Sequence, residues 1–101
     1  MGRMFYEVAA SFTDPATAES WQRWMLEEHM AEVLNCGASA TRLVRLDESR
    51  LTFVAQYEFP SRHALDDYLV RHAPRLRAEG AKRFPPDCVT YTRRTGEIVE
   101  K

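Results

Sequence analysis

Several chemical signatures are missing from this chain, and their absence excludes common classes of function. The two cysteines, Cys36 and Cys88, lie far apart and match no C-x-x-C spacing, so neither a zinc site nor a dithiol redox centre is indicated. The H-E-x-x-H, G-x-S-x-G, P-loop and G-x-G-x-x-G motifs are absent as well. We therefore expect no metal and no cofactor.

An excess of charge of one sign is also missing. There are 14 basic and 15 acidic residues, a net charge of −1, so no protein-wide positive field attracts a polyanion, and we expect no nucleic-acid partner. Residues 71–83 carry five Lys or Arg against one acid, but no aromatic residue there could stack on bases. We interpret this segment as a solvated helix face; the alternative is a local anion site at Arg71, Arg75 and Lys82.

Long apolar runs are absent too. No stretch approaches the roughly 20 apolar residues of a membrane span, and the N-terminus lacks the apolar core of a signal peptide. Two free thiols suit a reducing compartment. These features predict a cytoplasmic protein without a membrane partner.

The hydrophobic pattern predicts an α+β fold. Apolar periodicity and turn residues indicate the order strand, helix, strand, strand, helix, strand, over residues 4–12, 15–35, 39–46, 51–59, 61–84 and 87–93. Asp14 and Ser61 are placed to cap the helices, and Pro74 should break or kink the second one. The order predicts a single ferredoxin-like βαββαβ domain over residues 1–101, with both helices on one face of a four-stranded antiparallel sheet. Residues 95–101 should form a loose tail.

The other face of such a sheet has no helix to cover it. Phe5 and Val54, together with Val89 and Tyr91, are expected there, which predicts a homodimer through the open sheet face. Buried charge needs partners, so we expect the polar residues of this face to pair with arginines. The polar residues are Glu7, Gln56 and Glu58, and the candidate partners are Arg42, Arg45 and Arg93.

The segment WQRWMLEEHM, residues 21–30, combines core and candidate site residues. Trp21 and Trp24 lie on the helical stripe that should pack on the sheet. The apolar stripe then rotates, which predicts a bend near His29 and places this imidazole at a corner facing a pocket. The alternative is a surface or helix-terminal histidine. Tyr6 and Tyr57 should face the helices, where each hydroxyl needs a partner.

Three segments together carry a resemblance to a known group: residues 21–37, WQRWMLEEHMAEVLNCG, residues 54–59, VAQYEF, and residues 69–84, LVRHAPRLRAEGAKRF. The chain resembles the dimeric α/β-barrel superfamily, close to a bacterial domain-of-unknown-function family. Its members pair their sheets back to back and include cofactor-independent monooxygenases, lactone isomerases, haem-degrading enzymes and small-molecule sensors. The resemblance implies a pocket between sheet and helices, lined by His29, Trp24, Tyr6, Tyr57 and Tyr68.

Two hypotheses for function follow. The first is a small homodimeric, metal-independent enzyme, monooxygenase- or isomerase-like, that acts on a small apolar or aromatic molecule with His29 as catalytic acid or base. The second is a small-molecule-binding or regulatory module, or a dimeric scaffold without catalysis. A pocket closed by tryptophan would leave only the scaffold.

Overall fold

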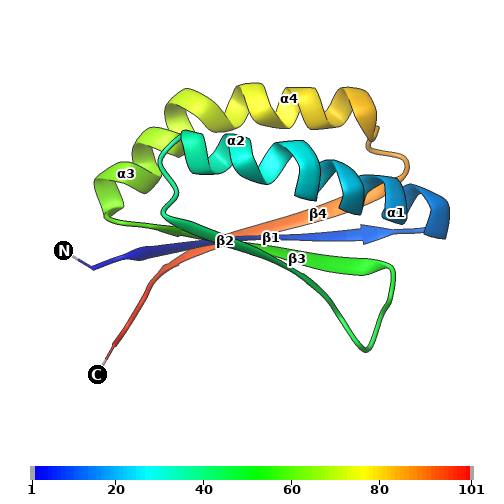
Figure 1. Cartoon of the computed structure of the whole chain (residues 1–101), viewed down its shortest axis with the longest axis horizontal. Helices are drawn as coiled ribbons and strands as arrows, with labels where there is room; N and C mark the ends of the chain where they lie inside the picture. Colours follow the sequence, from blue (N-terminus) through cyan, green and yellow to red (C-terminus); the bar gives the residue numbers. More distant parts are fainter. Residues whose placement is uncertain (1, 101) are drawn as a thin grey trace.

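The computed structural model describes residues 2–100 and has the predicted order of elements (Figure 1). Two helical segments are π-helical and are labelled η. The elements are β1 (Met4–Phe12), α1 (Pro15–Trp24), η1 (Met25–His29), α2 (Met30–Asn35), β2 (Ala40–Arg45), β3 (Thr52–Phe59), α3 (Arg62–Asp67), η2 (Tyr68–His72), α4 (Ala73–Arg83) and β4 (Val89–Glu97).

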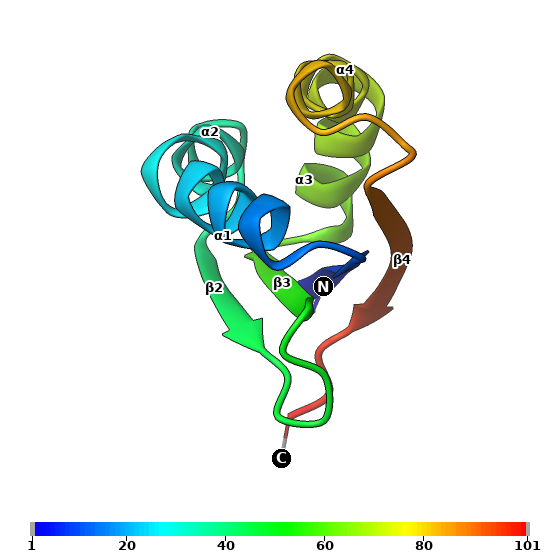
Figure 2. The same cartoon turned by 90° about the vertical axis from the view of Figure 1, so that its right-hand side faces the viewer.

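The four strands form one antiparallel sheet in the order β2-β3-β1-β4. Both helical stretches, α1 to α2 and α3 to α4, lie side by side over the same face of this sheet (Figure 2). The predicted ferredoxin-like fold is therefore confirmed, and so is the open face opposite the helices.

The helix starts follow from the capping residues. The Asp14 carboxylate accepts hydrogen bonds from the hydroxyl and the backbone N–H of Thr17, and these bonds lower the pKa of Asp14. Ser61 accepts a hydrogen bond from the backbone N–H of Ala64. Pro15 occupies the first helical turn, where its missing N–H is not needed.

Both helical stretches are interrupted by a π-helical turn. The backbone N–H of Met30 bonds to the carbonyl of Met25, and that of Ala73 bonds to the carbonyl of Tyr68, so each turn closes over five residues. The first turn ends at His29, where the rotated apolar stripe predicted a bend. The second ends at His72, two residues before Pro74, which has no N–H to continue the ordinary helical pattern.

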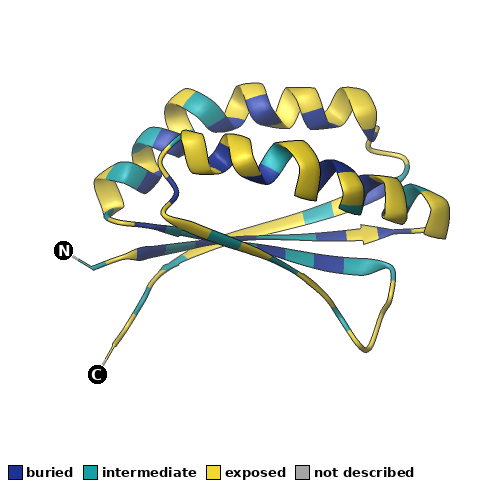
Figure 3. Ribbon diagram, viewed as in Figure 1, coloured by how far each residue is buried: buried dark blue, intermediate teal, exposed yellow. Residues whose placement is uncertain are grey.

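The core lies between the helices and the sheet. Trp21 is 1% exposed and packs against Phe12 and Phe53, with ring centroids 5.3 and 5.5 Å away. Trp24 is also buried, so the predicted core role of both tryptophans is confirmed. The buried stretches of the helices face the sheet, whereas their outer surfaces are exposed (Figure 3).

The prediction for Val89 and Tyr91 was wrong. Val89 pairs with Phe12 and Tyr91 pairs with Ala10, so both side chains face the helices, and the Trp21 indole N–H donates to the Tyr91 hydroxyl at 3.0 Å. Side chains alternate along a strand, so the register on β1 decides the face of every residue in β4. That register cannot be read from β4 alone.

The open face is consequently more polar than expected. Arg42 donates to Gln56, Gln56 donates to Glu7, and Arg94 donates to Glu7, which makes one continuous row across all four strands. Of the predicted partners, Arg42 is confirmed. Arg45 instead donates to Gln22 on α1, and Arg93 lies on the helix side of β4.

Glu58 is paired with Arg3, which was not among the predicted partners. The prediction of a loose tail over residues 95–101 was also wrong for residues 95–97, which belong to a strand. β4 extends to Glu97, which pairs with Met4, and the Ile98 N–H donates to the Arg3 carbonyl. β1 offers hydrogen-bonding groups along its full length, so β4 continues to pair beyond Arg93.

Loss of the Ser61 cap should destabilise the fold. We expect Ser61→Ala to lower the free energy of unfolding by about 1 kcal/mol, because the Ala64 N–H loses its acceptor. Urea denaturation measures the change. Ser20→Ala makes the same chemical change at an exposed position inside α1 and should leave stability equal or slightly higher. Equal loss in both variants would contradict the capping role.

Candidate functional site

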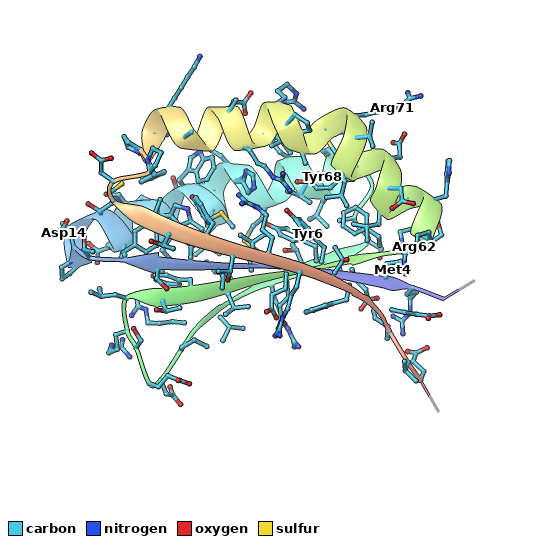
Figure 4. All side chains as sticks on the ribbon, turned by 180° about the vertical axis from the view of Figure 1, so that it is seen from behind. Met4, Tyr6, Asp14, Arg62, Tyr68 and Arg71 are labelled. Carbon is cyan, nitrogen blue, oxygen red and sulfur yellow. The ribbon has the colours of Figure 1, made fainter. Side chains whose placement is uncertain are left out.

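A small cavity lies between the helices and the sheet. It has a volume of about 50 Å³, and its lining comprises Tyr6, Val8, Trp21, Trp24, Met25, His29, Tyr57, Tyr68, Leu76, Arg77, Gly80, Tyr91 and Arg93. The five residues predicted for a pocket, His29, Trp24, Tyr6, Tyr57 and Tyr68, are all in this lining. Figure 4 shows Tyr6 on the sheet and Tyr68 on the helical layer at this interface.

The size of the cavity limits what it holds without rearrangement. A water molecule needs about 10–15 Å³ of such space, so the cavity accommodates a few waters. Pockets that enclose drug-sized ligands measure about 300 Å³ or more. A ring-sized ligand therefore enters only when lining side chains move apart.

The π-helical turn determines where His29 lies. An i→i+5 turn brings residues five apart onto one face of the helix, and Trp24 and His29 have this spacing. Their rings stack with centroids 4.7 Å apart and planes inclined by 29°. His29 is thus a half-buried residue that ends η1 and contacts the cavity.

The surroundings of His29 keep its ring neutral. Burial lowers the pKa of His29 from 6.5 to about 4; the Glu79 carboxylate opposes this effect and the Arg93 guanidinium adds to it. At neutral pH the imidazole is therefore uncharged, and one of its two ring nitrogens has no proton. That nitrogen can accept a proton or a hydrogen bond from a bound molecule.

Three of the tyrosines that line the cavity lie together, two from the sheet (Tyr6 and Tyr57) and one from the helical layer (Tyr68). The Tyr6 ring lies 5.8 Å from that of Tyr57 and 5.9 Å from that of Tyr68, centroid to centroid. The Tyr6 hydroxyl accepts a hydrogen bond from Arg77 at 3.1 Å. Within residues 2–100 the hydroxyls of Tyr57 and Tyr68 have no protein hydrogen-bond partner, so both can donate to a ligand.

Burial makes the hydroxyls of Tyr57 and Tyr68 harder to ionise than the hydroxyl of an exposed tyrosine. It raises the pKa of Tyr57 above its usual value, and neighbouring tyrosines add to this effect. Burial likewise raises the pKa of Tyr68, although Arg77 and Arg93 act in the opposite direction. The site thus combines a neutral histidine with neutral phenols.

Sequence reasoning missed Arg77, Tyr91 and Arg93 as lining residues. Val89, Tyr91 and Arg93 alternate along β4, so all three lie on one face, and placing one on the helix side places the others there too. That spacing was the available signal for Arg93. Arg77 follows Leu76 on α4, and the sequence contains no signal for its contact with Tyr6.

Three arginines of the basic segment of residues 71–83 have carboxylate partners, and one of them, Arg83, pairs with Glu28. Arg71 pairs with Asp67, and Arg75 lies near both Glu79 and Glu32. The structure thus gives Arg71 and Arg75 carboxylate partners, which favours the expected solvated helix face over the alternative of an anion site at Arg71, Arg75 and Lys82. Among residues 2–100, no three His, Cys, Asp or Glu side chains cluster closely enough to hold a metal ion. No helix in this range is long and apolar enough to cross a membrane.

A family model described as a domain of unknown function, DUF4286, matches residues 3–98. The chain belongs to the DUF4286 family. The predicted relationship to a domain-of-unknown-function family is confirmed. A search of curated proteins finds no match to this DUF4286 chain.

Solved structures share the fold of this DUF4286 chain at low identity. A dimeric ferredoxin-like protein from an uncultured marine organism is 12% identical, with a TM-score of 0.72 over 100% of this chain and 99% of its own. A second such protein is 10% identical, with a TM-score of 0.73 over 98% and 96%. SnoaB, a cofactor-independent oxygenase from Streptomyces nogalater, is 13% identical, with a TM-score of 0.71 over 100% and 97%. At these identities the likeness establishes the fold alone.

His29 should make stability depend on pH. The unfolded chain binds a proton at His29 below about pH 6.5, whereas the folded chain resists it down to about pH 4. The contribution of His29 to the free energy of unfolding should therefore be constant above pH 6.5. It should fall between pH 6.5 and pH 4, by at most about 3 kcal/mol.

The measurement is urea denaturation of wild type and His29→Gln across this pH range. The difference between the two isolates His29, because the carboxylates titrate in both proteins. His63 is exposed on α3, so His63→Gln serves as the matched control and should follow the wild type. Parallel curves for wild type and His29→Gln would refute the buried neutral state of His29.

Proposed function

We propose that this protein is a small homodimeric enzyme, independent of metal, in which His29 acts as general base on a small apolar or aromatic molecule bound between sheet and helices. The observation that carries the proposal is the neutral His29 imidazole, stacked on Trp24 at a cavity that two free tyrosine hydroxyls also line.

The residues divide into a base and hydrogen-bond donors. His29 accepts a proton from the substrate, and the neutral hydroxyls of Tyr57 and Tyr68 donate hydrogen bonds to the oxygen on which negative charge develops. In an isomerase the proton returns to a different carbon. In a cofactor-independent oxygenase the deprotonated substrate transfers electrons to molecular oxygen instead. The SnoaB fold supports the second type of reaction as a class.

The homodimer is proposed to form through the open sheet face. Besides the polar row, this face has an apolar row in which Val44 pairs with Val54 and Val54 pairs with Ala9. Glu7 is only 8% exposed although no helix covers it, and Arg94 supplies its counter-charge. The dimeric description of the two marine proteins supports this assembly. The free thiols of Cys36 and Cys88 support a cytoplasmic location.

A second candidate is a small-molecule-binding or regulatory module, or a dimeric scaffold, without catalysis. The small volume of the cavity favours it, because a ring-sized substrate has to displace side chains before any reaction. Ligand-dependent stabilisation without turnover would distinguish a binding module from the enzyme.

The first test is a thermal-shift screen with quinones, lactones and phenols, followed by turnover assays on the molecules that stabilise the protein. We expect His29→Gln to lower turnover by about 100-fold or more while the variant remains folded, because the base is lost. His63→Gln should retain full turnover. Equal turnover in His29→Gln and wild type would refute the role of His29.

The dimer is tested by analytical ultracentrifugation. Val54→Arg places a charge in the centre of the open face and should convert the dimer to a monomer at micromolar concentration. Val70→Arg, at a helix position that is 76% exposed, should leave the dimer intact. A monomeric wild type, or a dimer in both variants, would contradict assembly through this face.

A further inference from the structure

Two arginines contact the cavity without a carboxylate partner. Arg77 extends from α4 and Arg93 from β4, and both belong to the lining. Within residues 2–100, neither takes part in an ion pair, whereas Arg71, Arg75 and Arg94 all do. The lining includes no Asp or Glu side chain. The lining therefore has two positive charges and no negative one, and the nearby Glu79 carboxylate, which acts on His29 from outside the lining, is paired with Arg75.

Each guanidinium is oriented but keeps free donors. Arg77 uses one nitrogen to donate to the Tyr6 hydroxyl, which leaves most of its five N–H groups available. Arg93 lies over the face of the Tyr91 ring, with its central carbon 4.9 Å from the ring centroid. A cation–π contact of this kind leaves the N–H edge of the guanidinium unused. Both residues are exposed, so water hydrates the N–H groups that the protein does not use, and a ligand at the cavity would replace that water.

The two charges act on the same region of the cavity. Both guanidiniums oppose the rise in the pKa of the Tyr68 hydroxyl. The Tyr68 hydroxyl is itself a free donor. Arg77, Arg93 and Tyr68 all belong to the lining of this cavity, so a ligand oxygen there could accept hydrogen bonds from them.

The remaining walls are flat and aromatic. Tyr6 and Tyr57 stack with planes inclined by 27°, and Trp24 stacks on His29. Such walls favour binding of a planar ring, because its large apolar faces can pack against them. The combination of aromatic walls and an unpaired cationic end suits a molecule with a ring at one end and an anionic oxygen pair at the other.

We propose that Arg77 and Arg93 form an anion-binding subsite and that the ligand of this cavity is an aromatic carboxylate. Its carboxylate binds the two guanidiniums, and its ring enters between the aromatic walls when lining side chains move apart. This inference rests on the proposed function for the location of the ligand, and it narrows the substrate class. It concerns binding, so it does not require His29 to be catalytic.

Benzoate and benzamide form a matched pair of probes, because they have nearly the same shape and differ in charge. Their binding to the full chain is measured by isothermal titration calorimetry and by chemical-shift changes at Tyr68. We expect the wild type to bind benzoate at least about tenfold more tightly than benzamide. Arg77→Gln and Arg93→Gln should each remove this preference, while Arg77→Lys and Arg93→Lys should retain part of it.

Arg71→Gln is the control, because Arg71 lies outside the cavity and is paired with Asp67. It should keep the wild-type preference for benzoate. Arg77→Gln also removes a hydrogen bond to Tyr6, so its fold is checked by thermal unfolding. Arg93→Gln breaks no hydrogen bond to the core and decides the test if Arg77→Gln fails to fold.

The outcomes separate this inference from the proposed reaction. Equal affinity for benzoate and benzamide, absence of saturable benzoate binding, or a preference that survives Arg93→Gln would each overturn the subsite. Benzoate binding that depends on Arg93 and persists in His29→Gln supports the subsite whether or not turnover is found. Failure to detect turnover then counts against the enzyme alone.

Discussion

The contact between Trp24 and Gly80 fixes how closely the two helical stretches approach above the sheet. A Cβ atom on Gly80 would lie 3.3 Å from the Trp24 ring, so the absence of a side chain at this position lets the indole pack against the backbone of α4. Both residues line the cavity. Gly80 thus lets the two helical stretches approach closely beside the cavity, with the Trp24 ring between α4 and the sheet side of the lining.

The two π-helical turns bring polar side chains to this aromatic interior. A regular helix would present Trp24 and His29 on different faces, whereas the turn from Met25 to His29 stacks one ring on the other. The second turn begins at Tyr68 and contributes that tyrosine to the same cavity. Each interruption of a helix thus supplies a polar group to an otherwise aromatic interior, and the backbone hydrogen bonds remain satisfied by the longer i→i+5 pattern.

Much of the fold could be predicted because local signals agree with the overall arrangement. Asp14, Pro15 and Ser61 mark helix starts, and alternation in residues 51–59 marks a strand with one buried face. The face of β4 could not be predicted, because it depends on the pairing of Val89 with Phe12, a contact distant in sequence. The family resemblance was enough to predict that the five pocket residues line one cavity. Arg77 and Arg93 could not, since their role depends on which carboxylates are near them in space.

Glu7 has a consequence for folding beyond its contacts on the open face. It lies between Gln56 and Arg94 in the polar row, with its counter-charge beside it. A slip of β1 by one residue would turn this carboxylate towards the aromatic interior and leave Arg94 on the other side of the sheet. The misregistered sheet would then contain an unpaired buried charge, so Glu7 selects the correct strand alignment by making the nearest wrong one unstable.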